Sequence, residues 1–178
     1  MASEKTIRLA GISRDSLTNG PGLRKVYFAQ GCKHHCPGCF NESTWSFDDG
    51  KDFSVEELVD DLKDSLDYLD GITLSGGDPL EQYENFIPLV KYVNQQNKNV
   101  WAWTGYTWEQ LMARVPNEPK LLEFLQELDV LVDGLFVLAK RYDDNDMHGK
   151  FKGSSNQRII DVKKSLENNK VVLSKYDT

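Results

Sequence analysis

The apolar residues of this chain gather in short runs that end at glycines or polar clusters, and these runs predict a series of β-strands. They are rich in β-branched and aromatic side chains, which suit a pleated, half-buried surface. The first run, at 24–30, carries Val26, Tyr27 and Phe28 and leads into Gly31. The predicted strands cover residues 24–30, 71–77, 99–105, 129–134, 157–162 and 170–174.

Between these runs, apolar residues recur at three- and four-residue spacing, which predicts amphipathic helices. Two capping boxes give the clearest signals, Ser54 with Glu57 and Thr107 with Gln110, because each places an N-cap hydroxyl three residues before a Glu or Gln. Pro88 lies inside one helical stretch and favours a kink or an end there. The predicted helices cover residues 54–69, 81–96, 108–114 and 119–127.

Strands that alternate with helices in this rhythm predict an α/β fold with about five to six mostly parallel strands. The length of 178 residues suits a single domain spanning residues 1–178. A closed eight-stranded barrel needs about 250 residues, so we expect an open, partial (β/α) barrel. Ligand sites in such folds collect at the carboxyl ends of the parallel strands, where several predicted strands of this chain end in polar or glycine residues.

The charge balance disfavours binding to nucleic acid and to anionic membranes. The chain has 21 basic and 28 acidic side chains and a formal net charge of −7, whereas nucleic-acid binders carry a basic patch or stripe. The acidic excess also disfavours binding to anionic lipid. No apolar run approaches the ~20 residues of a membrane span, and residues 1–16 show no signal-peptide pattern. We therefore expect a cytoplasmic protein that binds neither nucleic acid nor membrane.

The only cysteines of the chain, Cys32, Cys36 and Cys39, follow the first predicted strand with the spacing C-x3-C-x2-C. Clustered thiols in a reducing cytosol indicate metal binding or catalysis rather than disulfides, and soft thiolates select zinc, copper(I) or iron–sulfur clusters. A structural zinc site needs four ligands, and His34 or His35 could supply the fourth. A [4Fe–4S] cube normally takes four cysteines, so three would leave one iron open to an outside ligand. The spacing favours the cluster, with a non-catalytic zinc-binding module as the alternative.

Residues at the ends of the other predicted strands are further candidates for ligand contact. Each also has a plain structural explanation: glycines suit a tight turn, strand aromatics are usually core, and a lone aspartate often caps a helix or turn. Serine and asparagine before a strand are common turn formers. The candidates are Ser75, Gly76, Gly77, Asp78, Pro79, Trp103, Thr104, Asp133, Ser155 and Asn156.

Taken in order, these motifs resemble those of the radical S-adenosylmethionine (SAM) enzymes, and within them the anaerobic ribonucleoside-triphosphate reductase-activating proteins. The cysteine spacing is similar to the cluster motif of the wider family. SGGDP is similar to its GGEP motif, with Asp78 in place of glutamate. NGPGLR at 19–24 looks like the DGPG(I/L)R segment of activases, with Asn19 in place of aspartate. WTGY at 103–106 and GSSNQR at 153–158 favour the reductase-activating branch over the pyruvate formate-lyase activases.

The resemblance implies a partial barrel of the radical SAM type and a definite mechanism. It implies a [4Fe–4S] cluster on the three cysteines, with Gly76, Gly77 and their neighbours seating the methionine end of SAM. Those contacts use backbone carbonyls, so the change to Asp78 is expected to be mild. One electron from the cluster would cleave SAM to methionine and a 5′-deoxyadenosyl radical. That radical would take a hydrogen atom from a glycine Cα in the C-terminal loop of an anaerobic ribonucleoside-triphosphate reductase.

The implied partners are that reductase and a flavodoxin-like or similar one-electron reductant. Activation of another glycyl radical enzyme is the alternative. Because the implied substrate is a peptide loop rather than a small molecule, the mouth of the site has to be wide. We expect residues 13–22 and 142–156 to frame it.

Overall fold

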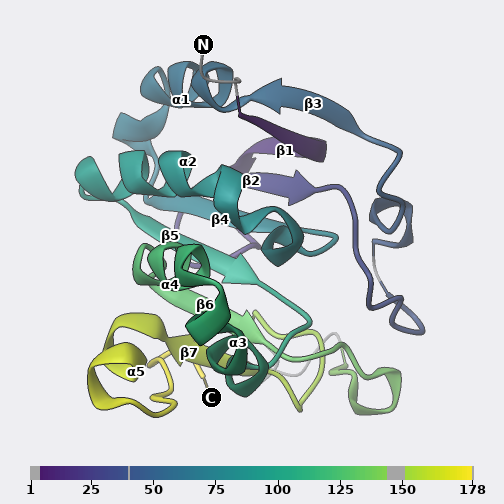
Figure 1. Cartoon of the computed structure of the whole chain (residues 1–178). Coiled ribbons are helices and arrows are strands. Elements are labelled where there is room, and N and C mark those ends of the chain that lie inside the picture. Colours follow the sequence, from purple (N-terminus) through teal and green to yellow (C-terminus); the bar gives the residue numbers. More distant parts are fainter. Residues whose placement is uncertain (1–4, 40, 144–150, 178) are drawn as a thin grey trace.

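The computed structural model describes residues 5–39, 41–143 and 151–177 and shows a seven-stranded sheet with helices packed against it (Figure 1). The strand order is β3-β1-β2-β4-β5-β6-β7. The strands are β1 (Thr6–Ser16), β2 (Arg24–Ala29), β3 (Lys51–Ser54), β4 (Gly71–Gly76), β5 (Asn99–Trp103), β6 (Val130–Asp133) and β7 (Arg158–Asp161).

The centre of the sheet is parallel and its margins are antiparallel. Strands β2, β4, β5 and β6 pair in parallel, whereas β1, β3 and β7 run antiparallel to their neighbours. The α/β class is confirmed, but the expectation of five to six mostly parallel strands is corrected to a mixed sheet with a parallel core. The sequence did not predict β1 and β3. The predicted strand at 170–174 contributes only an isolated bridge between Ile160 and Leu173.

Helices cover one face of the sheet and fill the connections between the parallel strands (Figure 1). They are α1 (Val55–Lys63), α2 (Tyr83–Gln95), α3 (Trp108–Arg114), α4 (Pro119–Gln126) and α5 (Val162–Asn168). Both predicted capping boxes are present, and Pro88 lies within α2 without ending it. The first helix ends at Lys63 rather than at 69, and α5 was not predicted. None of the described helices combines the length and the apolar composition that a bilayer crossing requires.

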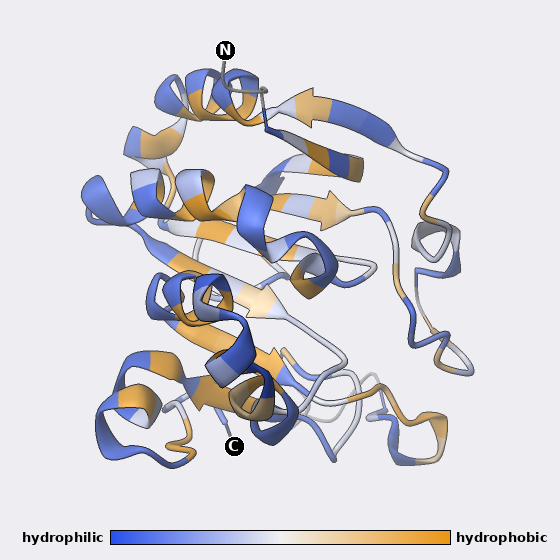
Figure 2. Cartoon of the chain, viewed as in Figure 1, coloured by the Kyte–Doolittle hydropathy of each residue, from blue (hydrophilic) through white to orange (hydrophobic). Residues whose placement is uncertain are grey.

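Alternation along the strands gives the sheet two different faces. On one face, strand residues such as Ile72 and Leu74 join the apolar sides of the helices in the main core. Figure 2 shows this pattern as apolar strands beneath helices whose outer sides are polar. The opposite face carries a smaller buried cluster, which consists of Trp101, Val130, Val132 and Ile159. Phe151 and Tyr176, from segments near the C-terminus, pack against it.

Parallel pairing brings the carboxyl ends of β2, β4, β5 and β6 to one edge of the sheet. In the register, Ala29 at the end of β2 lies opposite Gly76 at the end of β4. The chain leaves β2 and β6 on the same side of the molecule, at the right in Figure 1. The segments that carry the predicted site residues therefore meet at this edge.

Candidate functional site

The three cysteines lie on a loop that leaves the carboxyl end of β2. Cys32 N donates to Trp45 O at 3.1 Å, which ties the start of the loop to the returning chain, and Cys39 N donates to Cys36 O at 3.1 Å. All three are free thiols; Cys32 is buried and the other two are half-buried. The loop therefore presents three thiols that form no disulfide at the edge where the parallel strands end.

A cavity of about 140 Å³ has all three thiols in its wall. It brings together residues from the ends of β2, β4, β5 and β6, which are far apart in the sequence. The predicted candidates in its wall, besides the cysteines, are Ser75, Gly76, Gly77, Trp103 and Thr104. His34, which the sequence offered only as an alternative zinc ligand, also lines it. The sequence did not mark these further lining residues as ligand contacts: Trp45, Gly134, Phe136 and Gln157.

Two of these positions accept only glycine. Gly76 has φ +100°, and a Cβ there would lie 2.4 Å from Ala29 N. A Cβ on Gly77 would lie 2.4 Å from Gly31 O. The end of β4 therefore packs directly against the start of the cysteine loop, and the backbone of both segments borders the cavity.

The donor set fits an iron–sulfur cluster. Burial raises the pKa of the Cys32 thiol to about 11 and also raises that of Cys36, so these thiols hold their protons until a cation replaces them. Three soft donors on one cavity wall suit a cluster that keeps one iron for an outside ligand. Within residues 5–39, 41–143 and 151–177, no three His, Cys, Asp or Glu side chains stand close enough to hold a single metal ion.

Asp78 links the cysteine loop to the ends of β4 and β5. Its carboxylate is fully buried. It accepts hydrogen bonds from Leu80 N (3.0 Å), Thr104 Oγ1 (2.9 Å) and Gly105 N (3.0 Å), and it pairs with His34 Nε2 at 2.7 Å. The bond to Asp78 raises the pKa of His34. The sequence argument considered only the backbone at this position, whereas the structure places the side chain at the centre of a network.

A second cavity, of about 620 Å³, adjoins the first, because His34, Gly105 and Gly134 line both. The predicted candidates Asp133 and Asn156 lie in its wall. Asn156 Nδ2 donates to Leu135 O at 2.8 Å, which holds the segment after β6. These two candidates therefore border the larger cavity and not the one that contains the thiols.

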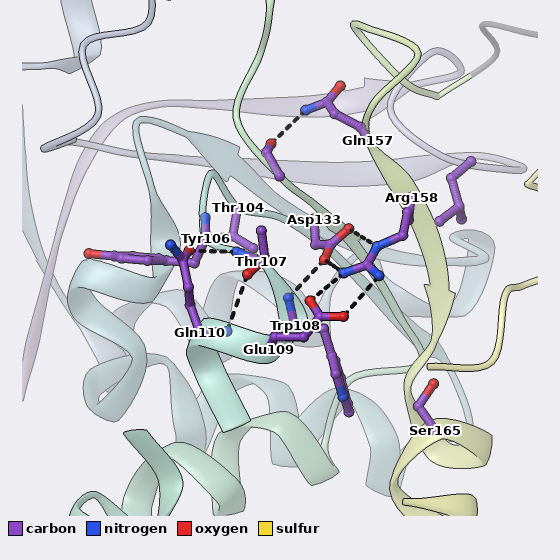
Figure 3. Close-up of polar contacts among 12 residues, drawn as sticks. Thr104, Tyr106, Thr107, Trp108, Glu109, Gln110, Asp133, Gln157, Arg158 and Ser165 are labelled. Carbon is purple, nitrogen blue, oxygen red and sulfur yellow. Dashed lines mark hydrogen bonds and ion pairs between the residues drawn. The ribbon is translucent and has the colours of Figure 1, made fainter. Parts of the chain in front are cut away.

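Asp133 is bound on two sides by the protein (Figure 3). Its Oδ2 accepts from Trp108 N at 2.8 Å at the start of α3. Both of its oxygens contact the Arg158 guanidinium, which also forms two hydrogen bonds with Glu109. This network lines part of the larger cavity.

The side chain of Gln157 fixes the turn that precedes β7. Its Nε2 donates to Gly134 O at 3.0 Å, and its Oε1 accepts from Gly153 N (2.7 Å) and Ser154 N (3.1 Å). Gln157 is buried and lines the thiol cavity. The sequence signal that could have identified Gln157 is its position directly before the strand β7.

Besides Asp78, two predicted candidates are in the wall of neither cavity. Pro79 is buried at the start of the short 3-10 turn η3 (Pro79–Gln82). Ser155 is exposed, and its backbone N donates to Lys140 O at 2.9 Å. Neither residue is in the wall of either cavity.

The segment 13–22 does not frame the mouth of the site. Ser16 pairs with Arg24 at the amino end of β2, and Leu23 N donates to Asp70 Oδ2 at 2.8 Å just before β4. The segment therefore lies at the opposite end of these strands from the cysteines. The other segment expected to frame the mouth is 142–156. Its residues 144–150 lie outside the described residues.

Comparisons with known proteins show what this chain is similar to. A family model described as a 4Fe-4S single cluster domain matches residues 18–160. The anaerobic ribonucleoside-triphosphate reductase-activating protein of Escherichia coli K12 is 37% identical over 150 residues, covering 80% of this chain and 91% of the relative. The protein of the same name from Enterobacteria phage T4 is 40% identical over 149 residues, covering 79% and 85%. Among solved structures, QueE from Escherichia coli aligns with a TM-score of 0.45 and 14% identity over 57% of this chain and 54% of QueE.

Proposed function

The chain belongs to the anaerobic ribonucleoside-triphosphate reductase-activating proteins, and from this membership we propose that it is a radical SAM activase. It uses a [4Fe–4S] cluster to generate a glycyl radical on an anaerobic ribonucleoside-triphosphate reductase. One observation carries the proposal: the three thiols and the glycine backbone at the end of β4 line the same cavity. Metal donors and a backbone surface for a ligand are thereby adjacent.

The residues divide into those that hold the cluster and those that seat SAM. Cys32, Cys36 and Cys39 supply three thiolates and leave one iron for the methionine end of SAM. When bound, the cluster supplies the electron that opens the sulfonium C–S bond, and the 5′-deoxyadenosyl radical then takes a hydrogen atom from the partner's glycine. Gly76 and Gly77 line the same cavity as the thiols, and their backbone would meet the methionine end of SAM there.

The two adjoining cavities together provide room for SAM. The thiol cavity of about 140 Å³ is smaller than the roughly 300–1,000 Å³ of a small-molecule site. The neighbouring cavity of about 620 Å³ adds the space, and the two meet at Gly105 and Gly134. Ser75, Trp103 and Thr104 are then placed for the part of SAM nearest the cluster.

The mixed sheet supports the finer fold expectation of an open, partial barrel of the radical SAM type in a single domain. Its described strands share one sheet, and its parallel core ends at the proposed site.

The rim of the proposed site has exposed apolar side chains, Leu135 at 44% and Leu138 at 51% exposure. We propose that the glycine-bearing loop of the reductase enters at this rim. Each radical consumes one electron, which a flavodoxin-like reductant in the reducing cytoplasm would supply.

The decisive experiment combines metal analysis with electron paramagnetic resonance (EPR). Anaerobically reconstituted protein should be brown and contain about four irons per chain, as a [4Fe–4S] cube requires. After incubation with SAM, a reductant and the candidate reductase, the reductase should show a glycyl radical doublet. Replacing any one of Cys32, Cys36 or Cys39 by Ala should abolish SAM cleavage.

His35→Asn is the matched control, because it changes the same loop and asparagine tolerates the left-handed backbone found there (φ 48°). It should retain iron and activity. A colourless protein with one zinc would overturn the enzyme proposal. A doublet formed only on a different glycyl radical enzyme would overturn the choice of partner and leave the chemistry intact.

A further inference from the structure

Two consecutive side chains of the cysteine loop reach across to the segment after β4. His34 Nε2 lies 2.7 Å from Asp78 Oδ2, and Lys33 Nζ lies 3.3 Å from Glu81 Oε2. Both residues lie between Cys32 and Cys36 in the sequence. The loop is therefore attached to the neighbouring strand end at the point where it carries its first two thiols.

The Asp78 end of the contact is rigid. The carboxylate is fully buried, and besides His34 its oxygens are bound by Leu80 N, Thr104 Oγ1 and Gly105 N. Thr104 Oγ1 in turn accepts from Tyr106 N at 3.1 Å (Figure 3). Residues after both β4 and β5 thus fix the position of Oδ2 independently of His34.

The His34 ring is enclosed as well, with 13% of its side chain exposed. A Cβ on Gly105 would lie 2.5 Å from His34 Cδ2, so the ring packs directly on the backbone there. The Tyr106 ring meets it edge-on, with centroids 4.6 Å apart, and the Tyr106 hydroxyl is bound to Glu81. A hydrogen bond in such an enclosed site is stronger than one in water.

The neighbouring side chains are attached less firmly. The Lys33 side chain is 68% exposed, and exposed ion pairs contribute little. His35 stacks on Trp45, with ring centroids 4.6 Å apart, and is directed to the returning chain rather than to Asp78. Of the three residues between Cys32 and Cys36, His34 is the one with an enclosed, charge-assisted anchor.

We propose that His34 is a positioning residue for the cluster: its bond to Asp78 fixes the path of the chain between Cys32 and Cys36 before iron binds. The inference rests on the proposed function, because it assumes that the three thiols hold an iron–sulfur cluster. A loop ordered in advance loses less conformational freedom on binding. Residues that orient metal ligands in this way typically change metal affinity by about 10–100-fold when mutated.

The same geometry explains why the carboxylate is an aspartate. Asp78 Oδ1 caps η3 through Leu80 N while Oδ2 meets His34, Thr104 and Gly105. A glutamate would add a methylene to a fully buried side chain and could not keep both oxygens in these places. Aspartate and histidine at these two positions are therefore matched in length.

The test compares His34→Phe, which keeps a ring beside Tyr106 but has no donor, with His34→Gln, which keeps an N–H donor. In the metal-free protein, amide hydrogen exchange of residues 31–39 should be about tenfold faster in His34→Phe than in the wild type. In the reconstituted protein, iron loss to a chelator should be about 10–100-fold faster. His34→Gln should restore most of both, and His35→Asn should match the wild type.

Unchanged exchange and unchanged iron release in His34→Phe would overturn the proposal, as would faster release that His34→Gln does not correct. Thermal unfolding identifies any variant that fails to fold, and His34→Ala then replaces His34→Phe. The exchange measurement needs neither iron nor partner. It therefore reports on the His34–Asp78 contact even if the wild type binds no cluster. A wild type that binds no cluster would overturn the proposed function instead.

Discussion

Two buried aspartates lie at the carboxyl ends of two parallel strands that flank β5, and they differ in what they bind. Asp78, after β4, and Asp133, at the end of β6, are 0% and 1% exposed. Each accepts a backbone N–H where a helical turn begins, Asp78 from Leu80 and Asp133 from Trp108. The two aspartates are therefore alike in their burial and in the backbone N–H that each accepts.

The difference lies in the side chain that binds each carboxylate. Asp133 meets Arg158, its register partner on the adjacent strand β7, and the guanidinium contacts both carboxylate oxygens. Asp78 meets His34, a loop residue between two of the thiols, through one contact. A carboxylate paired across the sheet stabilises the framework, whereas one paired with a loop positions whatever that loop carries.

The largest expected effect is on stability, from Asp133→Ala. Removing this carboxylate leaves Trp108 N without its acceptor and Arg158 with only Glu109. The free energy of unfolding should fall by about 3 kcal/mol, the lower end of the cost of breaking a buried pair, because the Arg158 side chain is 32% exposed. Urea denaturation of the metal-free protein measures it. Iron release from the folded variant should match the wild type; release as fast as in His34→Phe would remove the distinction between the two aspartates.

Asp78→Asn should have a smaller effect on stability and a clear effect on iron. The favourable amide orientation keeps its oxygen toward His34, Thr104 and Gly105 and turns its NH₂ group to Leu80 N. That one donor then loses its acceptor, which costs about 2 kcal/mol when buried. The same urea experiment tests this value. Iron release should accelerate, because the His34 contact is then a bond to a neutral amide oxygen and is weaker than a bond to a carboxylate. A variant that loses stability but keeps its iron as tightly as the wild type would show that Asp78 serves the framework alone.

Arg158→Lys tests whether the paired geometry at Asp133 matters beyond its charge. Lysine keeps the charge but cannot place donors on both Asp133 and Glu109 in the planar arrangement of a guanidinium. The unfolding free energy should fall by about 1 kcal/mol, the contribution of one hydrogen bond. Equal stability of Arg158→Lys and wild type in urea would contradict a role for that geometry.

The smallest effect is expected from Glu109→Gln, at the outer end of this network. The bonds from Arg158 hold the pKa of Glu109 below its ordinary value. Its stabilising contribution is therefore present above the unfolded-state pKa of about 4.3 and is lost as the pH falls through the lower folded-state pKa. Because the side chain is 62% exposed, the loss at neutral pH should stay below about 1 kcal/mol. Urea midpoints measured from pH 7 to pH 3 should converge for the variant and the wild type.

Local sequence signals predicted the elements that depend on local interactions. The capping boxes at Ser54 and Thr107 start helices as expected, because cap and N3 residue satisfy each other within one turn. The strands at 24–30, 71–77, 99–105 and 129–134 correspond to β2, β4, β5 and β6, whose continuous apolar runs are typical of buried parallel strands.

At the margins of the sheet, β7 was predicted at 157–162, but β1 and β3 were not. β1 has a mixed burial pattern and owes its place to pairing with β2 on one side and β3 on the other. The apolar residues at 170–174 resemble a strand but lie where only one bridge forms. Strand pairing at an edge depends on a partner distant in the sequence, and local propensity does not report it.

For the site, the sequence alone determined which cysteines and glycines are candidates, because three thiols in eight residues and a Gly-Gly turn are chemical features of a single short segment. Which side chains join these segments was decided only by the tertiary structure. His34 and Asp78 are 44 positions apart, and Asp133 and Arg158 are 25 apart. The parallel register brings the first pair together and the antiparallel pairing of β6 with β7 brings the second. A buried carboxylate takes the partner that the fold places within hydrogen-bond reach, so identical residues at similar strand ends acquire different roles.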